Sequence, residues 1–169
     1  MELIRKVFDS AMVLKSRSRV DERGVMSVIS DDSIDGFRAK ETRIYSMNVP
    51  GTFFGIHYRD AEDPMNRIVS VVKGRGMDYL VDLRKDSPTY LKWEKIDLSE
   101  GSSLAVYVPA GIGHAFLSLE ENTVLSYSMD KSGKDGYAKT LNYLDGKIEL
   151  IPEIPVAVIS DYDREAPYL

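Results

Sequence analysis

The chain has 169 residues, of which 43% are hydrophobic and 29% charged, and this length and composition fit one globular domain with a sizeable core. Its formal net charge of -5 argues against a nucleic-acid binder with a broad basic surface, because binding to phosphates requires clustered Lys and Arg side chains. No cysteine is present, which excludes a disulfide framework, a thiolate nucleophile and a Cys-ligated zinc site.

The N-terminal segment predicts no association with a membrane. Residues 1–6 carry charges every few positions and have no apolar stretch long enough for a signal peptide or a membrane span. Together with the absence of cysteine, this pattern indicates a cytoplasmic protein.

Most of the chain has the pattern of an all-β protein, in which short β-like runs alternate with turn residues. A short helix is expected first, over 5–14. The expected strands are 52–59, 67–73, 77–84, 92–97, 103–108, 115–119, 123–129 and 156–159, with a second short helix over 134–144. No repeat or linker divides the chain, so residues 1–169 are expected to form a single domain.

The turn Gly74-Arg75-Gly76 joins two of the expected strands. It lacks the third glycine of a dinucleotide-binding fingerprint, and no helix follows it as that motif requires. We therefore expect a hairpin turn here and no nucleotide cofactor site.

The chain has two histidines, and both lie beside glycines in segments patterned as strands. His57 lies in the run 51–59, and His114 follows the turn Pro109-Ala110-Gly111-Ile112-Gly113. Either histidine alone is more simply interpreted as an ordinary core residue. Because the imidazole of histidine is the side chain best suited to proton transfer near neutral pH, they also indicate acid–base chemistry, and the residues around them favour this second interpretation.

Five motifs occur in the order and spacing of one enzyme family. They are DERG (21–24), GTFFGIHY (51–58), VDLRKDSPT (81–89) followed by Trp93, PAGIGHAF (109–116) and ISDYDREAP (159–167). The chain thus resembles the dTDP-4-dehydrorhamnose 3,5-epimerase family over nearly its whole length. This resemblance implies an all-β fold, the cupin-like double-stranded β-helix or jelly roll, with a few short helices.

The resemblance also implies a reaction on a nucleoside diphosphate 4-keto sugar, whose C–H bonds at C3 and C5 are acidified by the carbonyl group. His57 resembles the family's base, and Asp163 resembles the aspartate that pairs with it. Tyr127 resembles the proton donor on the opposite face of the sugar. At the family's lysine, which stabilises the C4 oxygen, this chain has Arg67, whose planar guanidinium keeps the charge but changes the geometry.

The alternation of side chains along a strand predicts which neighbours share a face with these groups. His57 is expected on the face of Phe53, Gly55 and Arg59. Tyr127 is expected on the face of Leu125 and Met129, toward the interior of the barrel.

Further residues are expected at the substrate site from the same resemblance: Arg23, Phe54, Arg59, Asp82 and His114. His114 and Asp82 match a second family pair that supports the site. Family members are homodimers in which the N-terminal segment of one subunit completes the site of the other. A homodimer is therefore expected here, with Arg23 acting across the interface.

No metal or other cofactor is expected. The turn before His114 resembles the second motif of metal-binding cupins, but their first motif, His-x-His, is here His57-Tyr58-Arg59. One histidine and a stray carboxylate make a poor transition-metal site. A metal-dependent cupin is a weaker alternative, which stoichiometric bound metal in the purified protein would support.

The chain departs from the family pattern mainly at the nucleotide and phosphate contacts. Phe54 replaces an arginine, Arg59 replaces a glutamine, Met26 and Val28 replace an aromatic residue and a glutamate, and Tyr162 replaces a lysine. These departures predict a substrate other than dTDP-4-keto-6-deoxyglucose, namely another nucleoside diphosphate 4-keto sugar. A second family tyrosine has no clear counterpart, so inversion at C3, at C5 or at both stays open.

Two functions are compatible with the sequence. One is a cofactor-independent epimerase of a 4-keto-6-deoxy sugar nucleotide. The other is an inactive cupin that binds a sugar nucleotide or a related small ligand. The retention of His57, Asp163 and Tyr127 favours the enzyme, because a binding module needs no base and acid on opposite faces of its ligand.

Overall fold

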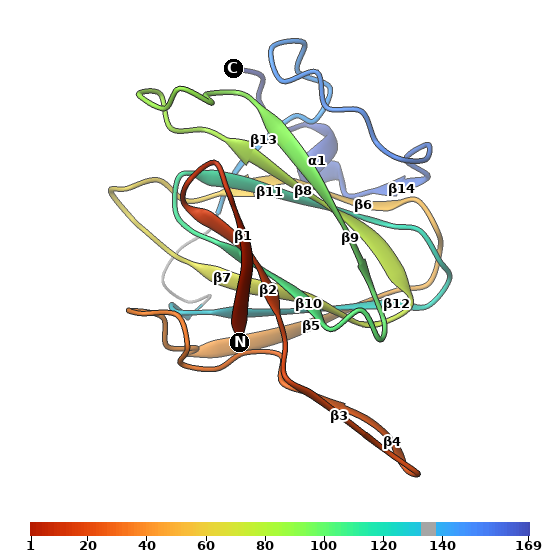
Figure 1. The fold of residues 1–169 in the computed structure, drawn as a ribbon. Coiled ribbons are helices and arrows are strands. Elements are labelled where there is room, and N and C mark those ends of the chain that lie inside the picture. Colours follow the sequence, from red (N-terminus) through yellow and green to blue (C-terminus); the bar gives the residue numbers. More distant parts are fainter. Residues whose placement is uncertain (133–137) are drawn as a thin grey trace.

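The computed structural model of the protein describes residues 1–132 and 138–169, and the strands in these ranges form three sheets (Figure 1). The first sheet has the order β1 (Glu2–Val7), β2 (Ala11–Lys15), β10 (Leu104–Val108), β7 (Arg67–Lys73), β12 (Thr123–Met129) and β5 (Glu41–Met47). The second has the order β13 (Lys139–Leu141), β6 (Thr52–Tyr58), β11 (Ile112–Ser118), β8 (Arg75–Asp82) and β9 (Trp93–Ser99), and β14 (Val158–Ile159) pairs with β6. A separate hairpin consists of β3 (Ser18–Asp21) and β4 (Gly24–Ser27).

The two larger sheets face each other across a shared hydrophobic core. Val69, Val106 and Leu125 of the first sheet pack in this core with Leu80 and Phe116 of the second. Burial of such apolar side chains is the main force that holds two sheets together. The result is the all-β, cupin-like jelly roll that the sequence predicts.

The second sheet is also covered on its outer face. Phe53, Ile56 and Tyr79 pack there with Ile148 and Leu150 of the C-terminal segment. Strand β11 is consequently buried along its whole length, and its sequence is correspondingly short of charged residues. The same outer layer brings the short helix α1 (Asp161–Arg164) to β6 (Figure 1).

The helix expected over 5–14 is wrong, because this segment forms the hairpin of β1 and β2. The chain reverses at Phe8 and Asp9, whose φ angles of 50° and 61° lie in the left-handed region. Asp9 and Ser10 are turn-forming residues, but a bulky residue such as Phe8 rarely adopts this conformation, so the sequence marks the turn only weakly.

The second expected helix, over 134–144, is only partly open to comparison. Residues 133–137 lie outside the described residues. Lys139, Thr140 and Leu141 form strand β13 rather than a helix, because they pair with the edge of β6. The sequence did not predict helix α1, which is capped by the Ser160 side chain and contains Asp163.

The turn at Gly74 also differs from its expected role. It joins β7 of the first sheet to β8 of the second, so it crosses between the sheets and is not the turn of a paired hairpin. Gly74 has a φ of 75°, and a Cβ atom there would lie 2.7 Å from the Thr123 Oγ1 atom. Glycine is therefore required both by the backbone and by the close approach of β12.

Most expected strands are present, with small differences at their ends. The strands over 67–73 and 123–129 have the expected bounds. Strands β1 to β5 were not predicted; β1, β3, β4 and β5 are largely exposed, whereas β2 is largely buried. Within the described ranges, we find no helix of the length and apolar character needed to cross a membrane.

Candidate functional site

A cavity of about 650 Å³ lies between the two larger sheets and is closed on one side by the C-terminal segment. Its polar lining includes His57, Arg59, Arg67, His114, Tyr127 and Asp163. Strands of both sheets and helix α1 contribute these side chains, so residues that are far apart in the sequence meet at one place.

The pair of His57 and Asp163 lies in one wall of this cavity. His57 Nε2 lies 2.6 Å from Asp163 Oδ1, a hydrogen-bonding distance. The other carboxylate oxygen, Oδ2, accepts a hydrogen bond of 3.1 Å from the backbone N–H of Gly55. The two bonds hold the carboxylate against β6, and the carboxylate in turn orients the imidazole.

Glycine at position 55 permits this approach. A Cβ atom at Gly55 would lie 2.9 Å from both Cγ and Oδ1 of Asp163, which is closer than real Cβ contacts. Any side chain at this position would therefore push the carboxylate of Asp163 away from the backbone of β6.

Burial and hydrogen bonding act in opposite directions on Asp163. Burial by itself raises the pKa of the carboxyl group, but the hydrogen bond and charge of His57, the Gly55 N–H and the Ser160 hydroxyl outweigh it. The pKa of Asp163 therefore lies below its ordinary value. The group is ionised at neutral pH and can stabilise a protonated imidazole.

A β-bulge in β6 directs His57 into the cavity. His57 pairs with His114 and Phe54 with Phe116, so two residues of β6 oppose the single residue Ala115 of β11. The bulge interrupts the alternation of side chains. Consequently Phe54 joins Phe53 and Arg59 in lining the cavity with His57, and Phe53 also packs in the outer core.

Tyr127 and Arg67 line the cavity from the first sheet, opposite the strand of His57. Tyr127 follows the predicted alternation, since Leu125 and Met129 line the cavity with it. Arg67 is buried, and this burial lowers its pKa to about 10, while Tyr127 and Asp78 act in the other direction. Arg67 therefore carries a positive charge at neutral pH inside the cavity.

The expected pairing of His114 with Asp82 is wrong, because His114 Nε2 lies 2.6 Å from Oδ1 of Asp78. His114 is directly opposite Leu80, so Asp78 and Asp82 are both its diagonal neighbours on the same face of the sheet. The spacing of the sequence alone cannot distinguish the two aspartates.

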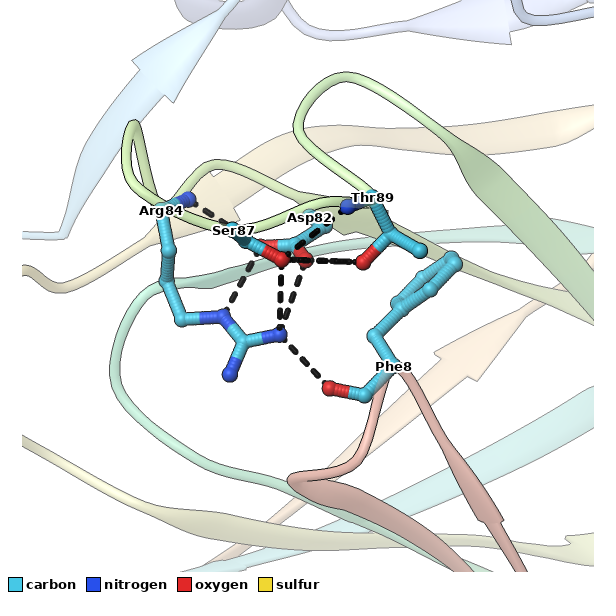
Figure 2. A network of polar contacts seen from close by, with 5 residues as sticks. All are labelled: Phe8, Asp82, Arg84, Ser87 and Thr89. Atoms are coloured by element: carbon cyan, nitrogen blue, oxygen red, sulfur yellow. Dashed lines mark hydrogen bonds and ion pairs between the residues drawn. The ribbon is translucent and has the colours of Figure 1, made fainter.

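Asp82 is instead engaged in a network of polar contacts with Arg84, Ser87 and Thr89 (Figure 2). Its Oδ2 atom accepts hydrogen bonds from Arg84, Ser87 and Thr89 at 2.8, 2.5 and 2.6 Å. The Arg84 Nη2 group also donates to the Phe8 carbonyl oxygen at 2.6 Å. Asp82 is fully buried in this network and does not line the cavity, so it is a structural residue and not a substrate contact.

Two other expected substrate residues, Arg59 and Phe54, do line the cavity. Arg59 is buried and forms an ion pair with Asp63, which also pairs with Lys131. Arg23 is in a different place. It lies in the turn of the β3–β4 hairpin, which projects from the body of the protein (Figure 1), and its exposed side chain pairs with Asp21.

Several residues of the site were not predicted from the sequence. Asp78 lies in a motif-free part of an expected strand, and its Oδ2 atom has no hydrogen-bond partner in the described part of the chain. Arg43 and Tyr45 line the cavity from β5, a strand that was not expected. The alternation over 41–47 is the signal that could have found them.

In residues 1–132 and 138–169 no group of three or more His, Asp or Glu is placed to hold a metal ion.

Comparison with known proteins identifies the family. The family model described as dTDP-4-dehydrorhamnose 3,5-epimerase matches residues 6–169. The chain belongs to this family. It is therefore an epimerase of the isomerase class.

Individual relatives agree with this assignment. The chain is 28% identical to the dTDP-4-dehydrorhamnose 3,5-epimerase of Methanothermobacter thermautotrophicus, over 95% of this chain and 90% of that protein. It is 33% identical to a dTDP-4-dehydro-6-deoxyglucose 3-epimerase of a Streptomyces species, over 70% of this chain and 61% of that protein. The crystal structure of the Bacillus anthracis dTDP-4-dehydrorhamnose 3,5-epimerase, with TDP and PPi bound, covers 99% of both chains at 26% identity and a TM-score of 0.88.

Proposed function

We propose that this family member inverts C3, C5 or both carbons of a nucleoside diphosphate 4-keto-6-deoxy sugar, with His57 as base and Tyr127 as proton donor. The observation that carries the proposal is that both side chains line one cavity from opposite sheets. A base and an acid on opposite faces of a sugar ring are what inversion of a carbon requires.

In the proposed reaction, His57 removes a proton from the carbon next to the ketone, and the bonding electrons move to the C4 oxygen to give an enolate. Asp163 orients the imidazole and stabilises its protonated form. The buried positive charge of Arg67 stabilises the enolate oxygen. Tyr127 then gives a proton to the carbon from the other face and regains one from solvent, while His57 releases the abstracted proton to solvent.

The substrate class follows from the relatives, and its nucleotide is open. The names of the relatives specify dTDP sugars, and both 3,5-epimerases and 3-epimerases occur among them. Because Phe54 replaces the family's arginine beside the sugar and diphosphate, we propose a different nucleoside diphosphate 4-keto sugar as substrate. Thermal stabilisation by dTDP, UDP, GDP or CDP would identify the nucleotide, since a ligand of the folded state raises the melting temperature.

We further propose a cytoplasmic homodimer in which Arg23 reaches the cavity of the partner subunit. The β3–β4 hairpin supports this arrangement, because it projects from the body and exposes Val20, Val25 and Met26. Exposed apolar side chains on a projecting hairpin are typical of a contact surface. Arg23 does not line the cavity of its own chain.

The test is the transfer of solvent deuterium to the sugar. The 4-keto-6-deoxy sugars of dTDP, UDP, GDP and CDP are incubated with the protein in D₂O and followed by NMR. Deuterium is expected at C3, C5 or both, and His57→Ala and Tyr127→Phe are each expected to slow inversion about 100-fold or more.

Tyr107→Phe is the matched control, because Tyr107 is also partly buried in the first sheet but packs against Phe37, away from the cavity. The Tyr107→Phe variant should incorporate deuterium at the parental rate. If the parent incorporates no deuterium from any of these sugars, the epimerase proposal fails and a binding function is favoured instead.

A further inference from the structure

Three arginines line the cavity, and they differ in their access to solvent. The side chains of Arg67 and Arg59 are buried, and Arg59 is paired with Asp63. The side chain of Arg43 is 46% exposed. A charged group of a ligand that enters from solvent can therefore reach Arg43 without displacing packed side chains.

Arg43 lies beside the residue proposed to donate the proton. It is directly opposite Tyr127 in the pairing of β5 with β12, where side chains of two strands are neighbours. Its Nε group donates a 2.5 Å hydrogen bond to Oε1 of Glu41. The side chain of Arg43 also forms a hydrogen bond with Tyr127. A guanidinium group has several further N–H donors, so these two contacts leave donors for a ligand.

The wall next to Arg43 is apolar. Tyr45 lies two residues further along β5, on the same face, and its ring packs edge-on against the ring of Phe54 with 4.3 Å between centroids. Phe54 occupies the position at which the family has an arginine near the sugar and the diphosphate. The cavity therefore has no charge at position 54, and its exposed arginine lies on β5 instead.

We propose that Arg43 binds the phosphate group attached to C1 of the substrate, in place of the arginine that Phe54 replaces. This inference rests on the proposed function. It fits the chemistry of the substrate, because C3 and C5 are each separated from C1 by one ring atom, so a sugar with its phosphate at Arg43 keeps both carbons near Tyr127. The planar guanidinium can bind phosphate through two parallel hydrogen bonds.

Calorimetric binding measurements test the role of Arg43 without requiring activity. The nucleoside diphosphate that binds the parent most tightly is chosen from dTDP, UDP, GDP and CDP, and its nucleoside serves as the uncharged probe. Arg43→Met is expected to weaken diphosphate binding about 10- to 100-fold and to leave nucleoside binding unchanged. Arg43→Lys, which keeps a positive charge, should lose less affinity for the diphosphate.

Arg75→Met is the matched control. The side chain of Arg75 is 48% exposed and also pairs with a carboxylate, that of Asp97, but it lies outside the cavity. It should bind the diphosphate like the parent. In addition, Phe54→Arg introduced into the Arg43→Met variant should restore part of the lost affinity, because it returns the charge to the family's position.

Two results would overturn the inference and leave the epimerase proposal intact. One is parental affinity of Arg43→Met for the diphosphate. The other is an equal loss of nucleoside and diphosphate affinity, which would indicate lost packing rather than a lost phosphate contact. A parent that binds none of the four diphosphates would instead contradict the proposed function together with this inference.

Discussion

At the scale of the residue, the contact between Asp163 and β6 depends on the absence of a side chain at Gly55. The carboxylate occupies the space of the missing Cβ atom and reaches both the Gly55 N–H and the His57 ring. The glycine of the Gly-x-His motif therefore has a steric role in the site, in addition to its position next to the proposed base.

Gly55→Ala is accordingly expected to lower epimerisation about 10- to 100-fold, because a displaced carboxylate no longer orients the imidazole. The measurement is the rate of deuterium incorporation, together with the thermal unfolding midpoint. Gly146→Ala is the control, since a Cβ atom at Gly146 would meet nothing within 4 Å. Equal rates for Gly55→Ala and the parent would show that the approach of Asp163 is unimportant.

The residues proposed for the proton transfers were found from motifs in the sequence, whereas the direction of some neighbouring side chains was not predictable. His57, Asp163 and Tyr127 were identified from their motifs, and all three line the same cavity. The neighbours of His57 were predicted only in part, since Phe53 and Arg59 line the cavity with it and the β-bulge adds Phe54. A bulge adds one residue to a strand without any residue type that marks it, so strict alternation cannot anticipate it.

At the scale of the element, Asp82 holds the turn after β8 in place. Burial by itself would raise its pKa, but the hydrogen bonds from Arg84, Ser87 and Thr89 outweigh this effect, so the pKa lies below the ordinary value. In the unfolded chain these bonds are absent. The unfolded chain therefore binds the proton more readily, and the free energy of unfolding decreases as the pH falls below about 4.

Asp82→Asn is expected to reduce the free energy of unfolding at pH 7 by about 3 kcal/mol, because it breaks a buried ion pair and leaves Arg84 without its charge partner. The variant should also lose less stability than the parent between pH 7 and pH 3. Urea unfolding at both pH values measures the two effects. If the free energy of unfolding of the variant falls between pH 7 and pH 3 as much as that of the parent, the pH dependence does not come from Asp82.

Asp97→Asn is the control for this experiment. Asp97 also pairs with an arginine, Arg75, but both side chains are more than 40% exposed, with values of 44% and 48%. An ion pair at the surface contributes little, and the loss at pH 7 should be below about 1 kcal/mol.

At the scale of the whole molecule, the proposed homodimer would place Arg23 of one subunit at the cavity of the other. This arrangement predicts complementation between two inactive variants. In a dimer of one Arg23→Ala chain and one His57→Ala chain, the first chain's cavity would have its own His57 and the Arg23 of its partner. One cavity of each mixed dimer would then be complete.

Equal amounts of the two variants, unfolded together and refolded, are expected to recover roughly a quarter of the parental exchange rate, since half the dimers are mixed and half their sites are complete. Each variant refolded alone is the control and should stay inactive. Recovery of no activity, with dimers confirmed by light scattering, would show that Arg23 does not act across the interface.

The sequence by itself determined the class of the fold, the family and the chemistry of the proposed proton transfers. Apolar runs separated by turn residues indicate strands, and motifs such as Gly-x-His carry their residues in a fixed local order. The tertiary structure decided which strands pair and which side chains meet. It placed Asp78, and not Asp82, beside His114, and it brought Arg43 of an unpredicted strand to Tyr127. These contacts join residues distant in the chain, and their register depends on core packing, which no short stretch of sequence records.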